Sequence, residues 1–138
     1  MNVLLYVFDS LRPDHLSSYG YERETSPTID DVAEDGVTFT NAFAQAIWTA
    51  PTSGSIFTGM YPSVHGGETV SEPLSPEAPR LAEAASEAGL TTGCVSSIDQ
   101  VSSFRGYDEG FDEFVQLFET YDPNDPQLGE ALHDRVDE

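Results

Sequence analysis

The chain has 138 residues, of which 38% are hydrophobic, and a formal net charge of −20 from 25 acidic residues against five arginines. This length predicts one domain with a modest core, and the ordinary apolar fraction excludes general disorder. The charge disfavours nucleic acid and anionic membranes as partners, and because the acids are dispersed, adaptation to high salt (a halophilic protein) is favoured over a local cation-binding cluster.

No basic-then-apolar leader precedes the first apolar run, and no run is long enough to span a bilayer. These features predict a cytoplasmic protein without a membrane partner. The single cysteine, Cys94, excludes an internal disulfide, and its small-residue surroundings favour a buried structural thiol over a reactive one.

The first half of the chain predicts two strands and two helices. The apolar residues 2–8 predict a parallel-sheet strand that ends at Asp9, followed by a loop or short helical turn over 10–21. Ser26 and Pro27 have the form of a helix start, and Gly36 that of its end. Residues 37–43 are strand-like, and 51–57 predict a short helix that stops at Gly59.

The second half continues the alternation. It predicts a polar loop over 68–79, an amphipathic helix over 80–88, a strand over 90–95 and loops over 99–113. Residues 115–121 are ambiguous between strand and helix. Alternating elements indicate βαβ units, hence an α/β fold. We expect one α/β domain over 1–121, and an acidic helix or tail over 122–138.

Two polar residues lie at the places where an α/β fold binds ligands, the end of a strand and the start of a helix. Asp9 ends the first strand, and Thr49 immediately precedes the predicted helix. Because carboxyl ends of parallel strands and N-termini of helices meet at one edge of a sheet, the two side chains could converge on a metal and an anionic ester. Without further information, structural roles are favoured: a helix cap or loop carboxylate for Asp9, and an N-cap of the following helix for Thr49.

Three stretches of the chain carry motifs. The first contains Asp9-Ser10-Leu11-Arg12, Asp14 and Tyr19-Gly20. The second contains Thr49, Pro51, Thr52, Ser53, Thr58-Gly59, Tyr61-Pro62 and His65-Gly66. The third is RLAEAASEAGLTT with the later GYDEGFDEF. Together these stretches resemble the sulfatase family of the alkaline phosphatase superfamily, and the resemblance covers most of residues 2–115.

This resemblance implies a three-layer α/β/α sandwich of alkaline phosphatase and sulfatase type, cut short. It implies a divalent cation (Ca, Mg, Mn or Zn) held by Asp9, Ser10 and Thr49, with Thr49, His65 and Arg12 as catalytic candidates. For His65 a hydrogen-bonded structural role stays open, and for Arg12 a salt bridge to a neighbouring acid.

The departures from the family pattern fall on the chemistry. Thr49 stands where sulfatases have the cysteine or serine that becomes formylglycine, and oxidation of threonine would give a ketone rather than an aldehyde. Ser53 replaces an arginine, and Ser97 and Asp99 replace a lysine and a histidine. A threonine alkoxide on a metal suits phosphorus, so a phosphate ester is favoured over a sulfate ester.

The implied function is metal-dependent hydrolysis, or transfer, at a small-molecule sulfate or phosphate ester. No Asp-His-Gly motif, which the family uses for further ligands, follows Gly66. We therefore expect a site completed by a further segment or a second chain. The alternative is a catalytically inactive fragment that serves as an interaction module.

Overall fold

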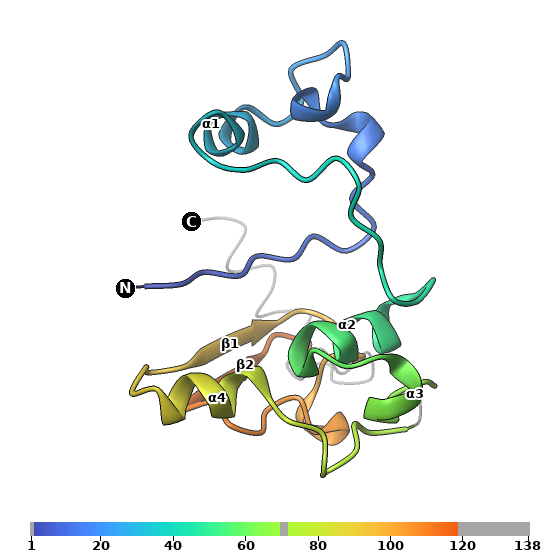
Figure 1. Ribbon diagram of the computed structural model, residues 1–138, viewed down its shortest axis with the longest axis vertical. Helices are drawn as coiled ribbons and strands as arrows, with labels where there is room; N and C mark the ends of the chain where they lie inside the picture. Colours follow the sequence, from blue (N-terminus) through green and yellow to red (C-terminus); the bar gives the residue numbers. More distant parts are fainter. Residues whose placement is uncertain (1, 70–71, 119–138) are drawn as a thin grey trace, which may run out of the picture. The chain divides into compact units, whose positions relative to one another are not determined.

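A computed structural model describes residues 2–69 and 72–118 of the chain. Its contacts divide the chain into two compact units, Met1–Phe43 and Ala44–Glu138, and Figure 1 shows the elements of each. None of the helices in the described ranges has the length and apolar character needed to cross a bilayer. The predicted acidic element over 122–138 lies outside the described residues.

The first unit contains two short 3₁₀ helices, η1 (Pro13–His15) and η2 (Ser17–Tyr19), and the helix α1 (Pro27–Asp35). α1 confirms the predicted helix, with Pro27 at its start. Its Asp30 carboxylate accepts hydrogen bonds from Ser17 and from Ser26, the latter at 3.3 Å, so one acid ties η2 to the helix start.

The strands predicted over 2–8 and 37–43 are absent, because neither segment is hydrogen-bonded to a neighbouring strand. Both segments lack strand assignment, and no residue pair within the first unit forms a strand ladder. Apolar composition favours extended backbone, but a strand exists only where a neighbour's N–H and C=O groups complete the ladder. The sequence therefore predicted the backbone preference and not the pairing.

The described part of the second unit, residues 44–69 and 72–118, contains three helices and a small sheet. The helices are α2 (Thr49–Thr58), α3 (Pro62–His65) and α4 (Leu81–Glu87), and the single turn η3 (Ser103–Arg105) follows later. α2 begins two residues before the predicted position and ends at Gly59, whose φ of +70° lies in the left-handed region that glycine tolerates. The short helix α3 was not predicted.

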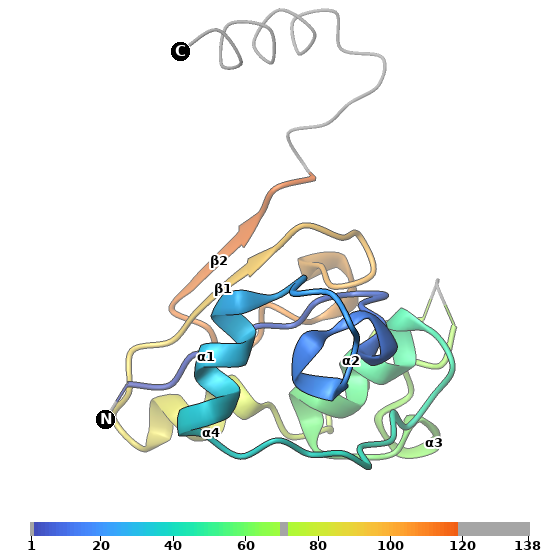
Figure 2. The same ribbon diagram turned by 90° about the horizontal axis from the view of Figure 1, so that it is seen from above.

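The sheet consists of β1 (Gly93–Ser96) and β2 (Glu113–Gln116), which pair in parallel with Gly93 opposite Glu113. The two strands lie side by side in both views (Figures 1 and 2). β1 confirms the predicted strand over 90–95, shifted toward its end. In the ambiguous segment 115–121, β2 makes Val115 and Gln116 strand, and residues 117–118 form a turn. The two strands pair in parallel although only loop and η3 connect them.

An aromatic cluster forms the core of the second unit. Leu74, Val101 and Tyr107 are buried, with Phe57 and Phe114 packed against them. The Phe57 and Tyr107 rings meet edge to face, with centroids 5.2 Å apart. This arrangement is favourable for aromatic pairs and joins α2 to the loop before β2.

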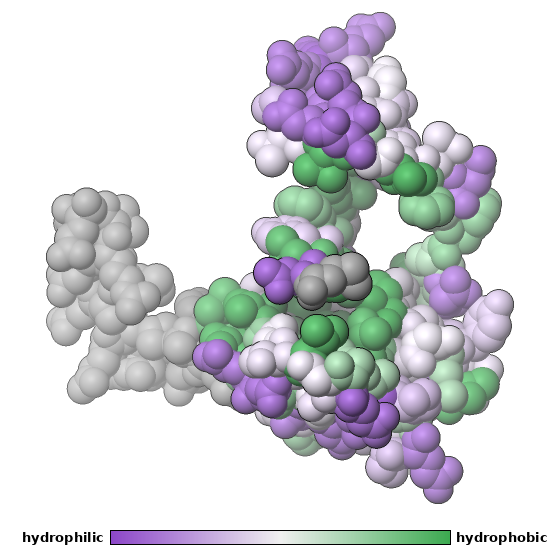
Figure 3. Space-filling model, turned by 60° about the vertical axis from the view of Figure 1, so that its left-hand side comes forward, coloured by the Kyte–Doolittle hydropathy of each residue, from purple (hydrophilic) through white to green (hydrophobic). Residues whose placement is uncertain are grey.

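Charge is distributed unevenly in the second unit. Its described residues include ten acids, Glu68, Glu72, Glu77, Glu83, Glu87, Asp99, Asp108, Glu109, Asp112 and Glu113. The only arginines there, Arg80 and Arg105, are 3% and 2% exposed. The charged side chains of this unit that face solvent are therefore all negative among the described residues. Figure 3 shows that hydrophilic and hydrophobic residues alternate on the surface.

Arg80 shows what a buried arginine does here. Its guanidinium donates to the carbonyl oxygens of Ser75, Ala78 and Gly106, at 2.6–3.2 Å, and pairs with Glu109 at 3.0 Å. Three carbonyls from two loops thus share one cation. The charge serves the fold, since it satisfies backbone oxygens that would otherwise be buried without a donor.

Candidate functional site

Asp9 and Ser10 form a turn at the end of the extended segment 2–8. The Ser10 hydroxyl lies 3.4 Å from Asp9 Oδ1 and donates to it. Ser10 has φ of +57°, the single non-glycine residue with a positive φ among those described. A side chain in the left-handed region costs roughly 1–2 kcal/mol, so this turn is held in a strained conformation.

Arg12 is engaged with a neighbouring acid. Its Nε and Nη2 atoms lie 3.0 and 2.6 Å from the two carboxylate oxygens of Asp14, a forked ion pair on the surface. The hydrogen bond from Arg12 lowers the pKa of Asp14. This is the salt-bridge alternative for Arg12, and a substrate anion would have to compete with Asp14 for the guanidinium.

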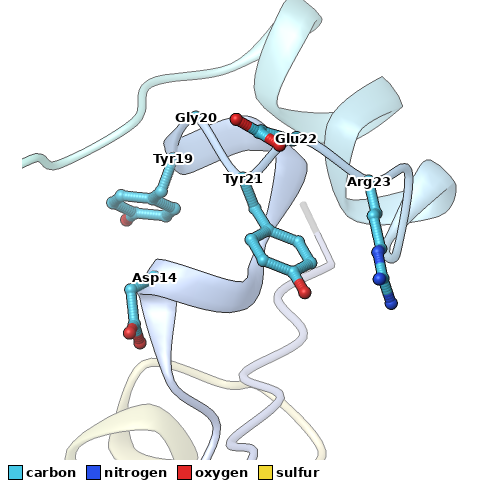
Figure 4. A pocket seen from close by; sticks show the side chains of 6 residues that line it. All are labelled: Asp14, Tyr19, Gly20, Tyr21, Glu22 and Arg23. Carbon is cyan, nitrogen blue, oxygen red and sulfur yellow. The ribbon is translucent and has the colours of Figure 1, made fainter.

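A surface hollow in the first unit lies next to this ion pair. Asp14, Tyr19, Gly20, Tyr21, Glu22 and Arg23 line it (Figure 4). Tyr19 and Tyr21 contribute rings, but the Tyr19 hydroxyl already donates to the carbonyl of Phe39, at 2.9 Å. Neither Asp9 nor Thr49 belongs to the lining, so the hollow is separate from the predicted chemistry.

Thr49 is the first residue of α2. The residue before it, Trp48, occupies the N-cap position with extended backbone and provides no side-chain capping bond. Thr49 itself is half-buried, and Ala50 behind it is fully buried. The Thr49 hydroxyl therefore stands at the N-terminus of a ten-residue helix, where the aligned peptide dipoles favour negative charge.

His65, the last residue of α3, is fully buried against α2. Its Nδ1 accepts the N–H of Gly67 at 3.1 Å, so Nδ1 carries no proton. Its Nε2 lies 3.1 Å from the Pro51 carbonyl and 3.3 Å from the Ser55 hydroxyl, so Nε2 carries the proton and donates it to Pro51. Burial lowers the pKa of His65, which favours this neutral tautomer.

Tyr107 is a residue that the sequence did not single out. It is fully buried, and its hydroxyl donates to the Ala50 carbonyl at 2.9 Å, beside Thr49. Burial raises the pKa of Tyr107 to about 12, and a hydrogen bond from Arg105 acts in the opposite direction. Its signal in the sequence was its place in the stretch GYDEGFDEF, directly after Gly106.

Ser97 and Asp99 lie in the loop after β1, and both are exposed. This is the carboxyl edge of the parallel pair, the edge at which α/β proteins bind ligands. Neither residue can supply the positive charge that the resembled family has at these positions. Ser53 is likewise uncharged, and it lies in the second turn of α2.

The predicted metal ligands do not form a complete cation site on their own. Among residues 2–69 and 72–118, no group of three or more His, Cys, Asp or Glu side chains is arranged to hold a metal. Asp9 and Ser10 belong to the first unit and Thr49 to the second. One carboxylate and two hydroxyls fall short of the six or more oxygens that a hard cation takes.

Comparisons with known proteins all indicate the same family. A family model described as Sulfatase matches residues 1–134. An N-acetylgalactosamine-6-O-sulfatase of Bacteroides thetaiotaomicron is 33% identical over 108 residues, which cover 78% of this chain and 19% of that protein. An arylsulfatase of Hemicentrotus pulcherrimus is 33% identical over 127 residues, covering 80% and 23% respectively. The chain thus spans about a fifth of the length of these relatives.

A solved structure agrees. The phosphonate monoester hydrolase of Agrobacterium radiobacter superposes with a TM-score of 0.71 and 25% identity, over 93% of this chain and 27% of the other. This likeness confirms the predicted fold class, the α/β architecture of the alkaline phosphatase superfamily, of which the chain carries a part. The roles predicted for Asp9, Ser10, Arg12, Thr49 and His65 stay predictions.

Proposed function

Because the chain belongs to the sulfatase family, we propose that it is part of a hydrolase that acts on sulfate or phosphate esters. The observation that supports the proposal is the position of Thr49 at the N-terminus of α2. The resemblance of the segment from Thr49 to Gly66 implies that this is the family's nucleophile position. The family and its superfamily use a divalent cation. The activity of a protein containing this chain, and its substrate, are parts of the proposal.

We assign Thr49 as the nucleophile. Its Oγ1 would bond to the phosphorus of an ester while the bond from phosphorus to the leaving oxygen breaks, with the hydroxyl proton passing to solvent. The N-terminus of α2 favours the alkoxide that this step requires. Water then releases phosphate and restores the threonine.

A phosphorus-centred substrate fits better than a sulfate ester. Thr49 cannot become formylglycine, and the positions of the family's arginine, lysine and histidine are occupied by Ser53, Ser97 and Asp99. The structural neighbour, by its title, is a hydrolase of phosphonate monoesters. Both observations support a phosphate or phosphonate ester.

Asp9 and Ser10 are our proposed contribution to a divalent cation site. The strained φ of Ser10 supports a functional role for this turn, because strain of this kind concentrates at such sites. Residues 2–69 and 72–118 do not complete the site, so we propose that further ligands come from residues outside these ranges, of the same polypeptide or of a second chain.

The remaining candidates take supporting roles in this proposal. Arg12 would bind a substrate anion by exchanging it for Asp14, its present partner. His65 uses both ring nitrogens within the fold, so we propose that it acts by holding α2 rather than by transferring a proton.

The alternative function is a silent interaction module or half of a split site. The absence of a three-ligand group among the described residues favours it for the 138-residue chain alone. We therefore expect little or no turnover of aryl phosphates or sulfates by this chain with Mn²⁺, Mg²⁺, Ca²⁺ or Zn²⁺. Turnover above background that is lost in Asp9→Ala would refute the alternative.

The nucleophile is tested by trapping, in this chain or in a longer polypeptide that contains it and shows activity. Mass spectrometry after incubation with an aryl phosphate should find a phosphate adduct on Thr49. Thr49→Ala should abolish the adduct and turnover, and Thr49→Ser should keep part of both. Thr52→Ala is the matched control, because it removes a hydroxyl from the same helix, one bonded to Ala46 at 3.2 Å. Phosphatase activity that survives Thr49→Ala, or a sulfate ester turned over faster than the phosphate, would overturn the assignment.

We further propose that the acidic surface is an adaptation to high salt. The described solvent-facing charges of the second unit support this, since none is positive to offset the acids nearby. At a salt concentration near 1 M the Debye length is about 3 Å, so the repulsion is screened. A cytoplasmic location stays a prediction.

A further inference from the structure

The first turn of α2 is weakly held by the helix itself. Its N-cap, Trp48, gives no side-chain bond to the free N–H groups of the first turn. The first intrahelical bond, from Thr52 N–H to the Trp48 carbonyl, is long at 3.4 Å. A helix start of this kind frays readily, because fraying breaks few hydrogen bonds.

Two buried side chains from outside the helix bond to this turn. The Tyr107 hydroxyl donates to the Ala50 carbonyl at 2.9 Å, and His65 Nε2–H donates to the Pro51 carbonyl at 3.1 Å. Both side chains are fully buried. The two acceptors belong to the residues directly after Thr49, so the nucleophile candidate is joined covalently to the held segment.

The two bonds together fix more than either would alone. Consecutive helix residues are rotated by about 100° around the axis, so the two carbonyls are held from different directions. Bonds from two directions restrict rotation of the helix about its axis as well as its displacement. The His65 ring also lies against α2 at Gly54, where an added Cβ would come within 2.5 Å of the ring. Rotation about this axis is the motion that would swing the Thr49 hydroxyl.

Each donor is itself held. Gly67 N–H bonds His65 Nδ1, which fixes the tautomer that donates from Nε2. The Tyr107 hydroxyl donates its proton to Ala50, and the positive charge of Arg105, only 2% exposed, partly offsets the rise that burial causes in the pKa of Tyr107. The Tyr107 ring is locked edge to face against Phe57. Such support is what a positioned nucleophile needs.

We propose that Tyr107 and His65 are positioning residues for Thr49, which they hold through the Ala50 and Pro51 carbonyls. The inference rests on the proposed function for the role of Thr49. The two hydrogen bonds, from Tyr107 to the Ala50 carbonyl and from His65 to the Pro51 carbonyl, are called the clamp below, and they are a property of the 138-residue chain. The clamp can be measured without turnover.

The chain contains a built-in reporter of this clamp. Trp48 is its single tryptophan and directly precedes Thr49. Tyr107→Phe keeps the ring and removes only the hydroxyl. In this variant we expect Trp48 to show a lower fluorescence anisotropy and at least a 1.5-fold higher acrylamide quenching constant. The amide hydrogens of residues Thr52 to Ser55 should exchange at least tenfold faster with solvent. Both are measured under conditions where circular dichroism shows that the chain stays folded.

Tyr19→Phe is the matched control. It also removes one phenol-to-carbonyl bond of 2.9 Å, to Phe39 within the first unit. It should leave Trp48 and the α2 amides unchanged. His65→Gln, which retains an N–H donor for Pro51, should fall between wild type and His65→Ala in both readouts.

Three outcomes separate the alternatives. Faster exchange confined to α2 with altered Trp48 signals supports the clamp, and in an active polypeptide kcat should then fall at least tenfold in Tyr107→Phe with KM within twofold. Unchanged Trp48 and α2 signals in Tyr107→Phe, or equal changes in Tyr19→Phe, would overturn the proposal. An intact clamp together with activity that survives Thr49→Ala would instead refute the proposed function alone.

Discussion

Replacing Gly54 by alanine should destabilise the chain, although alanine is the better helix former. Gly54 lies inside α2, and an ideal Cβ there would come 2.5 Å from His65 Cε1 and 2.9 Å from each ring nitrogen. No real Cβ sits that close to a ring. The ring is fully buried and bonded on both sides, so it has no free direction in which to move.

The magnitude follows from two opposing terms. Glycine to alanine within a helix contributes about 1 kcal/mol of stability. Overpacking a rigid site costs about 1–3 kcal/mol, and displacing His65 breaks buried hydrogen bonds to Pro51 and from Gly67 that are worth about 1–3 kcal/mol. The net expectation is a loss of roughly 1–5 kcal/mol, centred near 3 kcal/mol, in the free energy of unfolding, a large part of the stability of a small domain.

Urea denaturation followed by circular dichroism measures this change. Urea is uncharged, so it does not screen the acidic surface as guanidinium chloride would. With a slope of about 1–3 kcal/mol per molar, the midpoint of Gly54→Ala should fall by roughly 1–2 M. Salt is kept constant throughout.

A double-mutant cycle tests the stated cause. In a His65→Ala background the ring is gone, so Gly54→Ala should be neutral or should stabilise by up to about 1 kcal/mol. Stabilisation by Gly54→Ala in the wild-type chain would refute the packing argument. So would an equal loss in both backgrounds, because the loss would then not come from the ring.

Three further predictions concern charge. The thermal midpoint should rise between 0.1 and 3 M KCl, because salt shortens the Debye length from about 10 Å to below 3 Å; a flat or falling midpoint would remove the salt-adaptation proposal. Stability should fall as the pH drops below about 6.5, because the pKa of His65 is lowered in the folded state and the unfolded chain therefore takes up the proton first. Urea midpoints compared between pH 7.5 and 5 measure this fall, and the part due to His65 should be missing in His65→Gln. Arg80→Met should lower the free energy of unfolding by about 3 kcal/mol in a urea titration, because it leaves three loop carbonyls without their donor. Glu109→Gln removes only the charge of a side chain that is 46% exposed, and should cost less than about 1 kcal/mol. Equal losses in the two variants would show that the ion pair dominates.

Local signals were sufficient for much of the fold. Pro27 after a serine marked the start of α1, Gly59 the end of α2, and the small-residue stretch over 80–88 the helix α4. These features act within a few residues through capping and backbone preference, so they can be read from the chain alone. Strands depend on a partner elsewhere, which is why residues 2–8 and 37–43 were predicted as strands and are not paired in the described units.

The sequence by itself determined the family, through Asp9-Ser10-Leu11-Arg12 and the segment from Thr49 to Gly66, and it placed Thr49 at a helix start. Only the tertiary structure decided what surrounds that start. The carbonyls of Ala50 and Pro51 have identical chemistry in any sequence, and nothing local selects their partners. Tyr107 lies 57 residues from Ala50 in the chain, and only folding brings the two together. Burial then turns an ordinary tyrosine and histidine into fixed donors, because inside the protein no water competes for their hydrogen bonds.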